Sequence, residues 1–291
     1  MKIKESFFTD YTILENANED YLSLSDTFKC GQCFRWEQLN DEKLFIGIAY
    51  EKILKAEQHD GFIKLNCNKE DYNNIWRKYF DIDTDYDLIK EELQKDNIMY
   101  KAITCSPGIR ILKQELFETT ISFITSSNSN IKRISNNIRD LSIILGRKLE
   151  EEKYAFPTVK ELSSSDLCTI NKCRAGFRCN YILESSRMIN KIVTDFNVNR
   201  YKSIGYEKTK KELMNFKGVG SKVADCIILF SGISSYAFPT DVWVKRIMEN
   251  LYIKKEVSLD YVQKYGQEKF GPLAGYAQQY LFYYARSNNI K

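Results

Sequence analysis

The chain has 291 residues, of which 43% are hydrophobic and 13% aromatic, and its formal net charge is +4. These values are typical of a folded protein with one large or two to three small domains, and they exclude a collagen-like or disordered chain. Charges recur every few residues at the amino terminus, and no segment approaches the ~20 apolar residues of a membrane span. We therefore expect a soluble intracellular protein.

The chain contains eight cysteines and one histidine. The length and the absence of a signal peptide favour free thiols over a disulfide framework. Cys30 and Cys33 have the spacing of half a zinc site, but there is no second such pair and His59 has no neighbouring ligand. The other candidates lack a fourth cysteine at iron–sulfur spacing: Cys168, Cys173 and Cys179. We expect neither a metal nor a cofactor.

Short alternating segments between residues 27 and 67 predict an antiparallel sheet. Turn residues such as Asn40-Asp41 and Asp60-Gly61 separate the segments. The predicted strands are FRWEQL (34–39), KLFIGIAY (43–50), KILKAEQ (52–58) and GFIKLNC (61–67).

After Asn68 the apolar residues recur with helical spacing. The predicted helical segments are 69–80, 85–96, 115–145, 180–193 and 206–216. The pattern predicts an α+β chain, in which a small N-terminal antiparallel β-sheet domain (1–98) precedes a larger α-helical domain (99–291).

Residues 206–230 have the pattern of a helix-hairpin-helix motif. A helix ends near Phe216, a glycine turn follows, and we expect Ser221 to be the N-cap of the second helix. Because glycine permits tight turns and close approach, the amides of Gly218, Val219 and Gly220 can meet a phosphate of the DNA backbone. A plain helix–helix turn is the alternative.

Lys222 and Asp241 each fall in the predicted first turn of a helix, 19 positions apart. The positive end of the helix and the nearby Lys217 disfavour an ammonium group, which favours a neutral, nucleophilic amine at Lys222. The carboxylate of Asp241 suits the positive end of its own helix. Taken alone, Lys222 also fits a solvated or phosphate-binding lysine.

Residues 201–255 contain ten Lys or Arg and five Asp or Glu, a local excess of five positive charges. A face that binds phosphate has such an excess, but so does a solvated helix surface. The charge pattern alone leaves both interpretations open.

The segments LMNFKGVGSKVADCIILF (213–230) and PTDVWVKR (239–246) resemble the signature of the 8-oxoguanine DNA glycosylase/AP lyase family. This family belongs to the helix-hairpin-helix glycosylases. The resemblance extends over nearly the whole chain, through GQCFRW (31–36, similar to an N-terminal strand motif), SFITSSNSNIKRI (122–134) and GPLAGYAQQYLF (271–282). Trp243 and Phe177 stand where eukaryotic members carry histidine and tyrosine, so we expect no phosphate contacts at these two positions. We expect a bacterial member of the family.

The resemblance implies a bifunctional DNA glycosylase/AP lyase that excises 8-oxoguanine in base excision repair. Lys222 would attack the sugar C1′ and form a Schiff base, which permits strand cleavage by β-elimination. Asp241 would stabilise the positive charge that develops on the sugar and would help to cap its helix.

The resemblance also implies residues that hold a flipped base. The carbonyl of Gly31 would accept a hydrogen bond from N7–H of the oxidised base, and Gln278 would bind its Watson–Crick edge. Phe282 and Cys226 would hold the ring between them. The residues implied to face the opposite cytosine are Asn128, Arg133 and Arg178. The implied partner is double-stranded DNA with an oxidised guanine, bound by a monomer in the bacterial cytoplasm, at the nucleoid, without a membrane.

Two alternatives remain at this stage. One is another helix-hairpin-helix glycosylase, acting on alkylated or mispaired bases, although Lys222 argues against a purely monofunctional enzyme. Relatives with an iron–sulfur cluster have a C-terminal cysteine quartet, and here no cysteine follows Cys226. The other is a non-catalytic DNA-binding module that uses the hairpin for backbone contacts.

Overall fold

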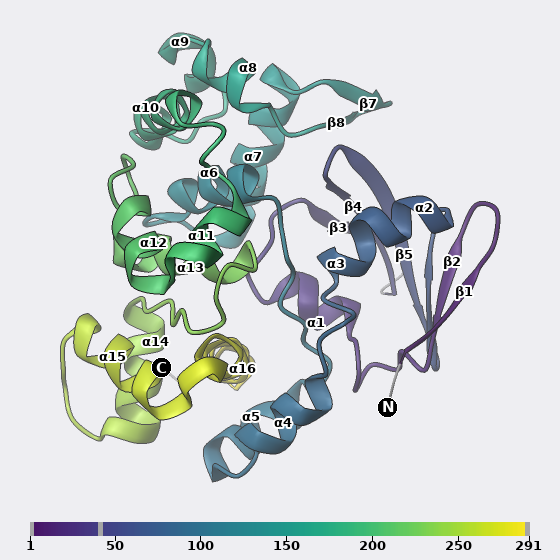
Figure 1. Ribbon diagram of the computed structural model, residues 1–291, viewed down its shortest axis with the longest axis vertical. Coiled ribbons are helices and arrows are strands. Elements are labelled where there is room, and N and C mark those ends of the chain that lie inside the picture. Colours follow the sequence, from purple (N-terminus) through teal and green to yellow (C-terminus); the bar gives the residue numbers. More distant parts are fainter. Residues whose placement is uncertain (1–2, 40–42, 289–291) are drawn as a thin grey trace.

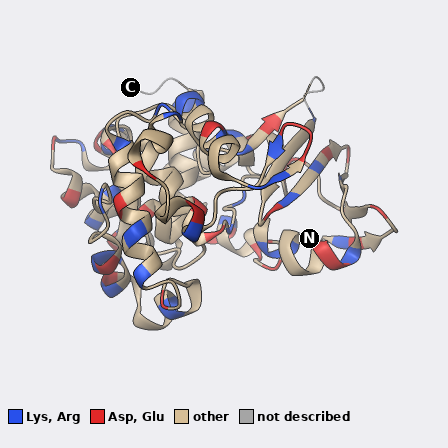
Figure 2. Ribbon diagram, turned by 90° about the horizontal axis from the view of Figure 1, so that it is seen from above, with Lys and Arg blue, Asp and Glu red and all other residues tan. Residues whose placement is uncertain are grey.

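The computed structural model describes residues 3–39 and 43–288. It consists of an antiparallel sheet beside a larger set of helices, which confirms the predicted α+β architecture (Figure 1). Charged residues of both signs are interspersed on the sheet and on the helices (Figure 2). The predicted turn at Asn40-Asp41 lies outside the described residues. Within the described ranges, no helix has both the length and the apolar character needed to cross a bilayer.

The main sheet has six antiparallel strands in the order β1-β2-β6-β5-β4-β3. The strands are β1 (Lys4–Phe7), β2 (Thr12–Glu15), β3 (Trp36–Gln38), β4 (Leu44–Ala49), β5 (Lys52–His59) and β6 (Phe62–Leu65). The four predicted strands are confirmed as β3 to β6, and Gly61 turns between β5 and β6 with a φ of +86°. Strands β1 and β2 were not predicted. They belong to the sheet because Leu14 is fully buried and pairs with Ile63.

Helices cover one face of this sheet and bury an aromatic core. They are α1 (Leu24–Lys29), α2 (Lys69–Asp71), the π-helical turn η1 (Tyr72–Trp76) and α3 (Arg77–Tyr79). Phe28 stacks on Trp36 with ring centroids 3.9 Å apart. A Cβ atom on Gly47 would lie 2.2 Å from the Trp36 ring, so only glycine lets this ring cover the sheet.

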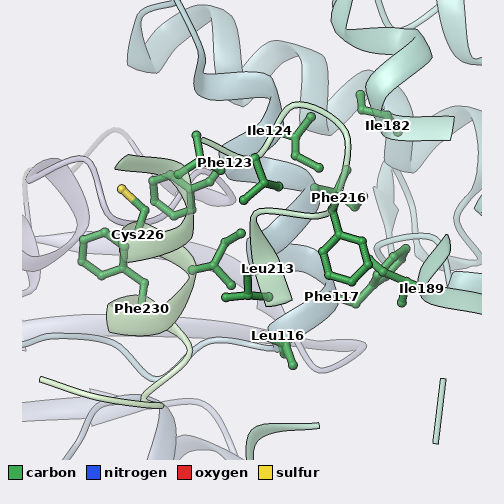
Figure 3. Packing of buried hydrophobic residues seen from close by; sticks show 14 of the residues in the cluster. Leu116, Phe117, Phe123, Ile124, Ile182, Ile189, Leu213, Phe216, Cys226 and Phe230 are labelled. Atoms are coloured by element: carbon green, nitrogen blue, oxygen red, sulfur yellow. The ribbon is translucent and has the colours of Figure 1, made fainter. Parts of the chain in front are cut away.

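The second core lies among the helices of the middle of the chain (Figure 3). These are α6 (Leu116–Ser126), α7 (Ile131–Leu145), α8 (Val159–Ser163), α9 (Leu167–Asn171), α10 (Arg178–Lys191), α11 (Val198–Ile204), α12 (Tyr206–Leu213) and α13 (Ser221–Phe230), with a small hairpin of β7 (Lys148–Glu150) and β8 (Lys153–Tyr154). The predicted helical segment 115–145 is interrupted, because the Asn130 side chain accepts from the amide of Arg133 and starts α7.

A third core joins helices from distant parts of the chain. Helices α4 (Tyr86–Leu93) and α5 (Asn97–Cys105) pack with α14 (Val242–Met248), the turns η2 (Glu249–Ile253) and η3 (Gly271–Leu273), α15 (Leu259–Phe270) and α16 (Ala274–Ser287). The predicted boundary between residues 98 and 99 falls inside α5, and the division into two domains stays a prediction.

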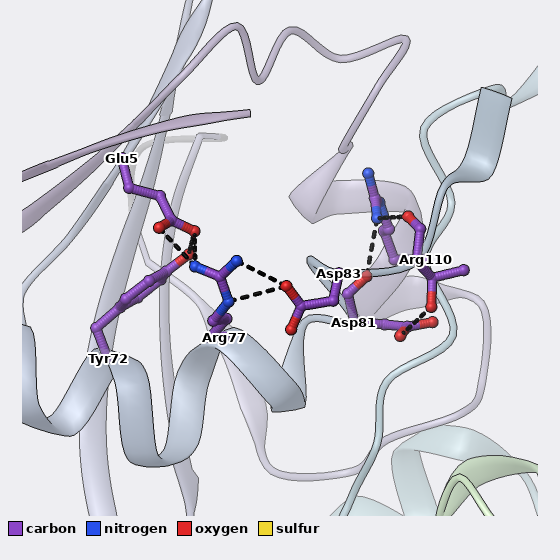
Figure 4. Close-up of polar contacts among 7 residues, drawn as sticks. Glu5, Tyr72, Arg77, Asp81, Asp83 and Arg110 are labelled. Carbon is purple, nitrogen blue, oxygen red and sulfur yellow. Dashed lines mark hydrogen bonds and ion pairs between the residues drawn. The ribbon is translucent and has the colours of Figure 1, made fainter. Parts of the chain in front are cut away.

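Buried and partly buried arginines connect the segments that lead from the sheet to the helices (Figure 4). Arg77 forms ion pairs with Glu5 and Asp83, both at 2.6 Å. Arg110 is fully buried and donates to the carbonyl of Asp81 at 3.0 Å. These bonds connect the loop at Asp81 and Asp83 to strand β1 and to the segment that contains Arg110.

Candidate active site

The helix-hairpin-helix motif is present as α12, a tight turn and α13. Gly218 has a φ of +80°, and a Cβ atom there would lie 2.8 Å from the Tyr181 ring. The prediction for Ser221 was wrong. Gly220, with extended backbone, is the N-cap, and Ser221 is the first helical residue. The Ser221 hydroxyl donates to the Gln263 side chain at 3.1 Å.

Lys222 and Asp241 line the same cavity, which has a volume of about 780 Å³. The first turn of α13 forms one wall, and the start of α14 forms another. The segment between α6 and α7 contributes Asn128, the first turn of α7 contributes Arg133, and α15 contributes Gln263. The fold thus brings five of the predicted site residues, Gly220 among them, to one concave surface, although they come from three separate segments.

Asp241 is the N-cap of α14, which places it one residue before the predicted first turn. Its side chain accepts hydrogen bonds from the amides of Trp243 and Val244, both at 2.9 Å. These bonds confirm the predicted capping role and fix the orientation of the carboxylate at the cavity.

The Lys222 amine lies beside the Phe123 ring and the Cys226 thiol, two side chains that are labelled in Figure 3. Its nitrogen is 5.4 Å from the centroid of the Phe123 ring. Cys226 follows Lys222 by four residues, one helical turn later, and is 3% exposed. Burial raises the pKa of the Cys226 thiol to about 11, while the neighbouring Lys222 opposes the rise. Cys226 is therefore a buried, neutral thiol one helical turn after Lys222.

Gly31 lies in the turn after α1, and not in a strand as the motif had suggested, because β3 begins only at Trp36. Its φ is +85°, a conformation that favours glycine. A Cβ atom on Gly31 would lie 3.3 Å from Ile131 and 3.8 Å from Phe282. The predicted partners Gly31 and Phe282 are therefore neighbours.

Gln278 is 5% exposed, and its side-chain oxygen has no hydrogen-bond partner among the described residues. An unpaired buried acceptor is costly in a folded protein, and such groups occur where a ligand supplies the missing donor. The adjacent Gln279 is bonded, since it donates to the carbonyl of Cys30 at 3.0 Å. That bond ties α16 to the turn that contains Gly31.

Arg178 is 2% exposed, and its guanidinium is occupied by main-chain carbonyls. It donates to the carbonyls of Ser127, Asn128 and Ala175. Asn128 has a φ of +49°, so this arginine holds a bent segment at the edge of the cavity. Its implied contact with an opposite base stays a prediction, as do those of Asn128 and Arg133.

Two residues that support the site were missed by sequence reasoning. Gln32 is fully buried and donates to the carbonyls of Thr27 and Arg110, which fixes the turn beside Gly31. Its place directly after Gly31 in the GQCFRW motif is a signal that could have identified it. Gln263 lines the cavity from α15, and no local pattern marks it.

Some charges of residues 201–255 pair with one another in the fold, which leaves the excess of five positive charges in this segment unchanged. Lys210 lies 3.0 Å from Asp225, and Lys245 lies 3.5 Å from Glu249. Trp243 lines the cavity and is 47% exposed. Within residues 3–39 and 43–288, no group of three or more His, Cys, Asp or Glu side chains is arranged to hold a metal ion.

The comparisons with known proteins agree with this geometry. Residues 13–120 match the model of the 8-oxoguanine DNA glycosylase N-terminal domain. The N-glycosylase/DNA lyase of Saccharomyces cerevisiae is 28% identical, over 91% of this chain and 84% of that protein.

Two solved structures resemble the whole chain. The Clostridium acetobutylicum 8-oxoguanine glycosylase/lyase, in complex with double-stranded DNA containing cytosine opposite 8-oxoG, is 41% identical over 100% of both chains, with a TM-score of 0.92. MBOgg1 in complex with a low-affinity DNA ligand is 38% identical over 99% of this chain and 100% of that chain, with a TM-score of 0.93. Both likenesses extend over nearly the full length of the chain. We therefore conclude that the chain belongs to the 8-oxoguanine DNA glycosylase/lyase family.

Proposed function

We propose that this protein is a bifunctional DNA glycosylase/AP lyase that excises 8-oxoguanine from duplex DNA, with Lys222 as the nucleophile. The observation that carries the proposal is the cavity in which Lys222 and Asp241 meet although they are 19 positions apart in the sequence. The names of the full-length relatives, which are glycosylase/lyases, support the choice of reaction.

In the first step the neutral amine of Lys222 attacks C1′ of the damaged nucleotide. The bond from C1′ to the base breaks, the base leaves with the electron pair and takes up a proton, and the sugar is bonded to the lysine nitrogen. Positive charge develops on the sugar in this step. The Asp241 carboxylate, held by two amides of α14, would stabilise that charge without having to reorient.

In the second step the sugar ring opens, and the lysine–sugar bond becomes a protonated Schiff base. Loss of a proton from C2′ then expels the 3′ phosphate, which cleaves the strand by β-elimination. Water hydrolyses the Schiff base and restores the free amine of Lys222. No redox partner is required, because the electron pairs balance within these steps.

Recognition of the lesion is assigned to four other residues: Gly31, Gln278, Phe282 and Cys226. The Gly31 carbonyl would accept from N7–H of 8-oxoguanine, a proton that guanine lacks. The unpaired oxygen of Gln278 would accept from the Watson–Crick edge of the base. Phe282 would lie on one face of the ring and the Cys226 thiol on the other.

The remaining contacts would be made to the rest of the duplex. The amides of the hairpin Gly218 to Gly220 would bind a backbone phosphate, and Asn128 and Arg133 would face the opposite base, with Arg178 beside them. Because the proposed substrate is chromosomal DNA, we propose that the protein acts in the cytoplasm, at the nucleoid. We also propose that it acts as a monomer.

The proposal is tested by borohydride trapping on a duplex that carries 8-oxoguanine opposite cytosine. The wild type should give a covalent protein–DNA adduct, because borohydride reduces the Schiff base. Lys222→Gln should give no adduct while it still binds the duplex. Lys208→Gln, which changes an exposed lysine on α12, is the matched control and should be trapped like the wild type.

Asp241→Asn adds a second arm to this experiment. Asparagine is as good an N-cap as aspartate, so α14 should stay folded. Excision should nevertheless slow by more than binding weakens. A wild type that binds the damaged duplex without releasing a base or forming an adduct contradicts the proposal and favours a DNA-binding module.

A further inference from the structure

The helix that carries Lys222 also carries a fully buried carboxylate, three residues further on. This carboxylate has no part in the proposed chemistry. Asp225 on α13 is fully buried. It accepts hydrogen bonds from the Tyr206 hydroxyl at 2.7 Å and from the Lys210 ammonium at 3.0 Å, both on α12. Burial raises the pKa of Asp225, and Lys210 opposes that rise. A buried charge of this kind persists only when every donor around it is kept in place.

The third donor to Asp225 is the side-chain amide of Gln263, on α15. The same amide also donates to the Tyr206 hydroxyl at 3.1 Å. Its oxygen accepts from the Ser221 hydroxyl at 3.1 Å. Gln263 is therefore bonded to both ends of the first turn of α13, and it also lines the cavity that contains Lys222.

The spacing of these partners is informative. Ser221 and Asp225 are four residues apart, so they lie on one face of α13. Lys222 and Cys226 are also four residues apart and form the neighbouring face. A single amide from α15 thus holds the face next to the nucleophile, and it sets the rotation of this turn about the helix axis.

Val219 and Val223 pack the start of α13 into the helical core, but its first turn has no side-chain cap. Its N-cap is Gly220, which has no side chain and makes no side-chain capping bond. Gly218, two residues earlier, has a positive φ. The amides at a helix start have no partner within the helix, so a first turn without a capping side chain gains order from a side chain of another element.

We propose that Gln263 is a positioning residue that fixes the first turn of α13 and thereby directs the Lys222 amine into the cavity. The inference rests on the proposed role of Lys222 as nucleophile. Because catalysis requires the reacting atoms at a defined separation, loss of this amide should slow excision between about tenfold and about 100-fold. It should leave DNA affinity unchanged, since Gln263 belongs to the positioning of the amine.

The first test compares Gln263→Leu with Gln267→Leu. Both glutamines lie on α15, one turn apart, and both are 8% exposed. Gln267 donates to the Tyr236 carbonyl at 3.2 Å, and no hydrogen bond joins it to α13 among the described residues. Single-turnover excision and borohydride trapping should slow in Gln263→Leu and not in Gln267→Leu, with equal duplex dissociation constants.

Ser221→Ala is the variant that leaves the buried network intact, because Asp225 keeps all three of its donors. It removes only the bond from the helix start to Gln263. We expect a slower excision rate than the wild type at an unchanged unfolding midpoint. An excision rate equal to that of the wild type in both Ser221→Ala and Gln263→Leu overturns the proposal.

Gln263→Glu provides a readout that a merely structural role would not move. The new carboxyl would face Asp225, with Tyr206, Lys210 and Glu207 as the other titratable groups around it. When protonated it can donate to Asp225 as the amide does, and when ionised it repels that carboxylate. Excision relative to the wild type should therefore be near normal at pH 5.5 and fall at pH 8.5. A ratio that is constant with pH contradicts the inference.

The two proposals fail in different ways. A wild type that forms no borohydride adduct overturns the role of Lys222 and that of Gln263 together. A wild type that is trapped normally, with Gln263→Leu trapped at the same rate, overturns the role of Gln263 alone.

Discussion

The Arg178 guanidinium donates a hydrogen bond to the carbonyl of Asn128 at 2.8 Å, across 50 positions of the sequence. Together with its bonds to the carbonyls of Ser127 and Ala175, this contact makes Arg178 a support for the segment between α6 and α7. The segment forms one wall of the cavity that contains Lys222 and Asp241. A residue implied to face DNA thus has a structural task that can be measured without DNA.

Arg178→Ala should lower the free energy of unfolding by about 2 kcal/mol, because it removes a buried side chain and leaves three main-chain carbonyls, one of them buried, without their donor. Denaturant titration measures this loss. Arg187→Ala is the control on the same helix, since Arg187 is exposed and donates to the carbonyls of Ser163 and Ser165 at the surface. A loss of less than about 1 kcal/mol in Arg178→Ala would contradict the supporting role.

Gly31→Ala should abolish lesion excision but spare strand cleavage at a preformed abasic site. The added methyl group would press on Ile131 and Phe282 and displace the Gly31 carbonyl, while Lys222 stays in place. Gly61→Ala is the matched control. Gly61 has nearly the same φ, +86°, but its added methyl group would meet no atom within 4 Å. Both variants should lose about 1–2 kcal/mol of stability from the left-handed backbone.

Only Gly31→Ala should lose excision of 8-oxoguanine, by at least about 100-fold, because only its methyl group reaches the residues proposed to hold the base. Excision and cleavage of an abasic duplex are measured in parallel. Equal loss of both activities would show that the substitution disturbs Lys222, and would remove the Gly31 carbonyl from lesion recognition.

Gln278→Leu and Gln279→Leu should have opposite effects on stability. The Gln278 oxygen has no partner in the fold, so leucine should leave the unfolding free energy unchanged or raise it by about 1 kcal/mol. Gln279 donates to the Cys30 carbonyl, so its loss should destabilise the fold by about 1–2 kcal/mol. Gln278→Leu should nevertheless slow excision strongly. Denaturant titration measures the stability of both variants, and a single-turnover assay measures the excision rate.

Glu118 makes the stability of the protein depend on pH. Burial raises the pKa of this carboxyl, and Arg35, at 3.1 Å, opposes the rise. The folded state therefore holds the proton to a higher pH than the unfolded state does. The stability from Glu118 is complete below about pH 4.5 and is lost as the pH rises through the folded-state pKa, by about 1.4 kcal/mol for each unit of the shift.

Glu118→Gln removes this titration but keeps an acceptor for Arg35. The unfolding free energy of the variant should fall less between pH 4.5 and pH 8 than that of the wild type. Urea titrations at a series of pH values compare the two slopes. Parallel slopes would mean that another group controls the pH dependence in this range.

Local patterns predicted the elements that depend on local chemistry. Alternation predicted β3 to β6, and the glycine turn predicted the hairpin between α12 and α13. Strands β1 and β2 were missed because frequent charges obscure their alternation, although Leu14 is fully buried. Ser221 was misassigned because residue preference alone places serine at an N-cap, while the extended backbone of Gly220 takes that position in the fold.

The site could be predicted only where a motif carried it. Lys222 and Asp241 followed from the resemblance and from the helix starts that hold them. The bond between Gln263 and Ser221 joins residues 42 positions apart, and no periodicity encodes such a contact. The same holds for Arg178. Its guanidinium binds main-chain carbonyls that the bend at Asn128 brings near it, and no local pattern around Arg178 indicates that bend.

The bond between Gln279 and the Cys30 carbonyl, which spans 249 positions, has a consequence for biosynthesis. The surface proposed to distinguish the lesion combines the turn at Gly31 with Phe282 of α16, whereas Lys222 and Asp241 are translated earlier. A nascent chain that has not yet released α16 from the ribosome carries the amine and the carboxylate but no complete pocket for the base. The proposed lesion selectivity therefore becomes available only after α16 has been synthesised and has packed against the turn that contains Gly31.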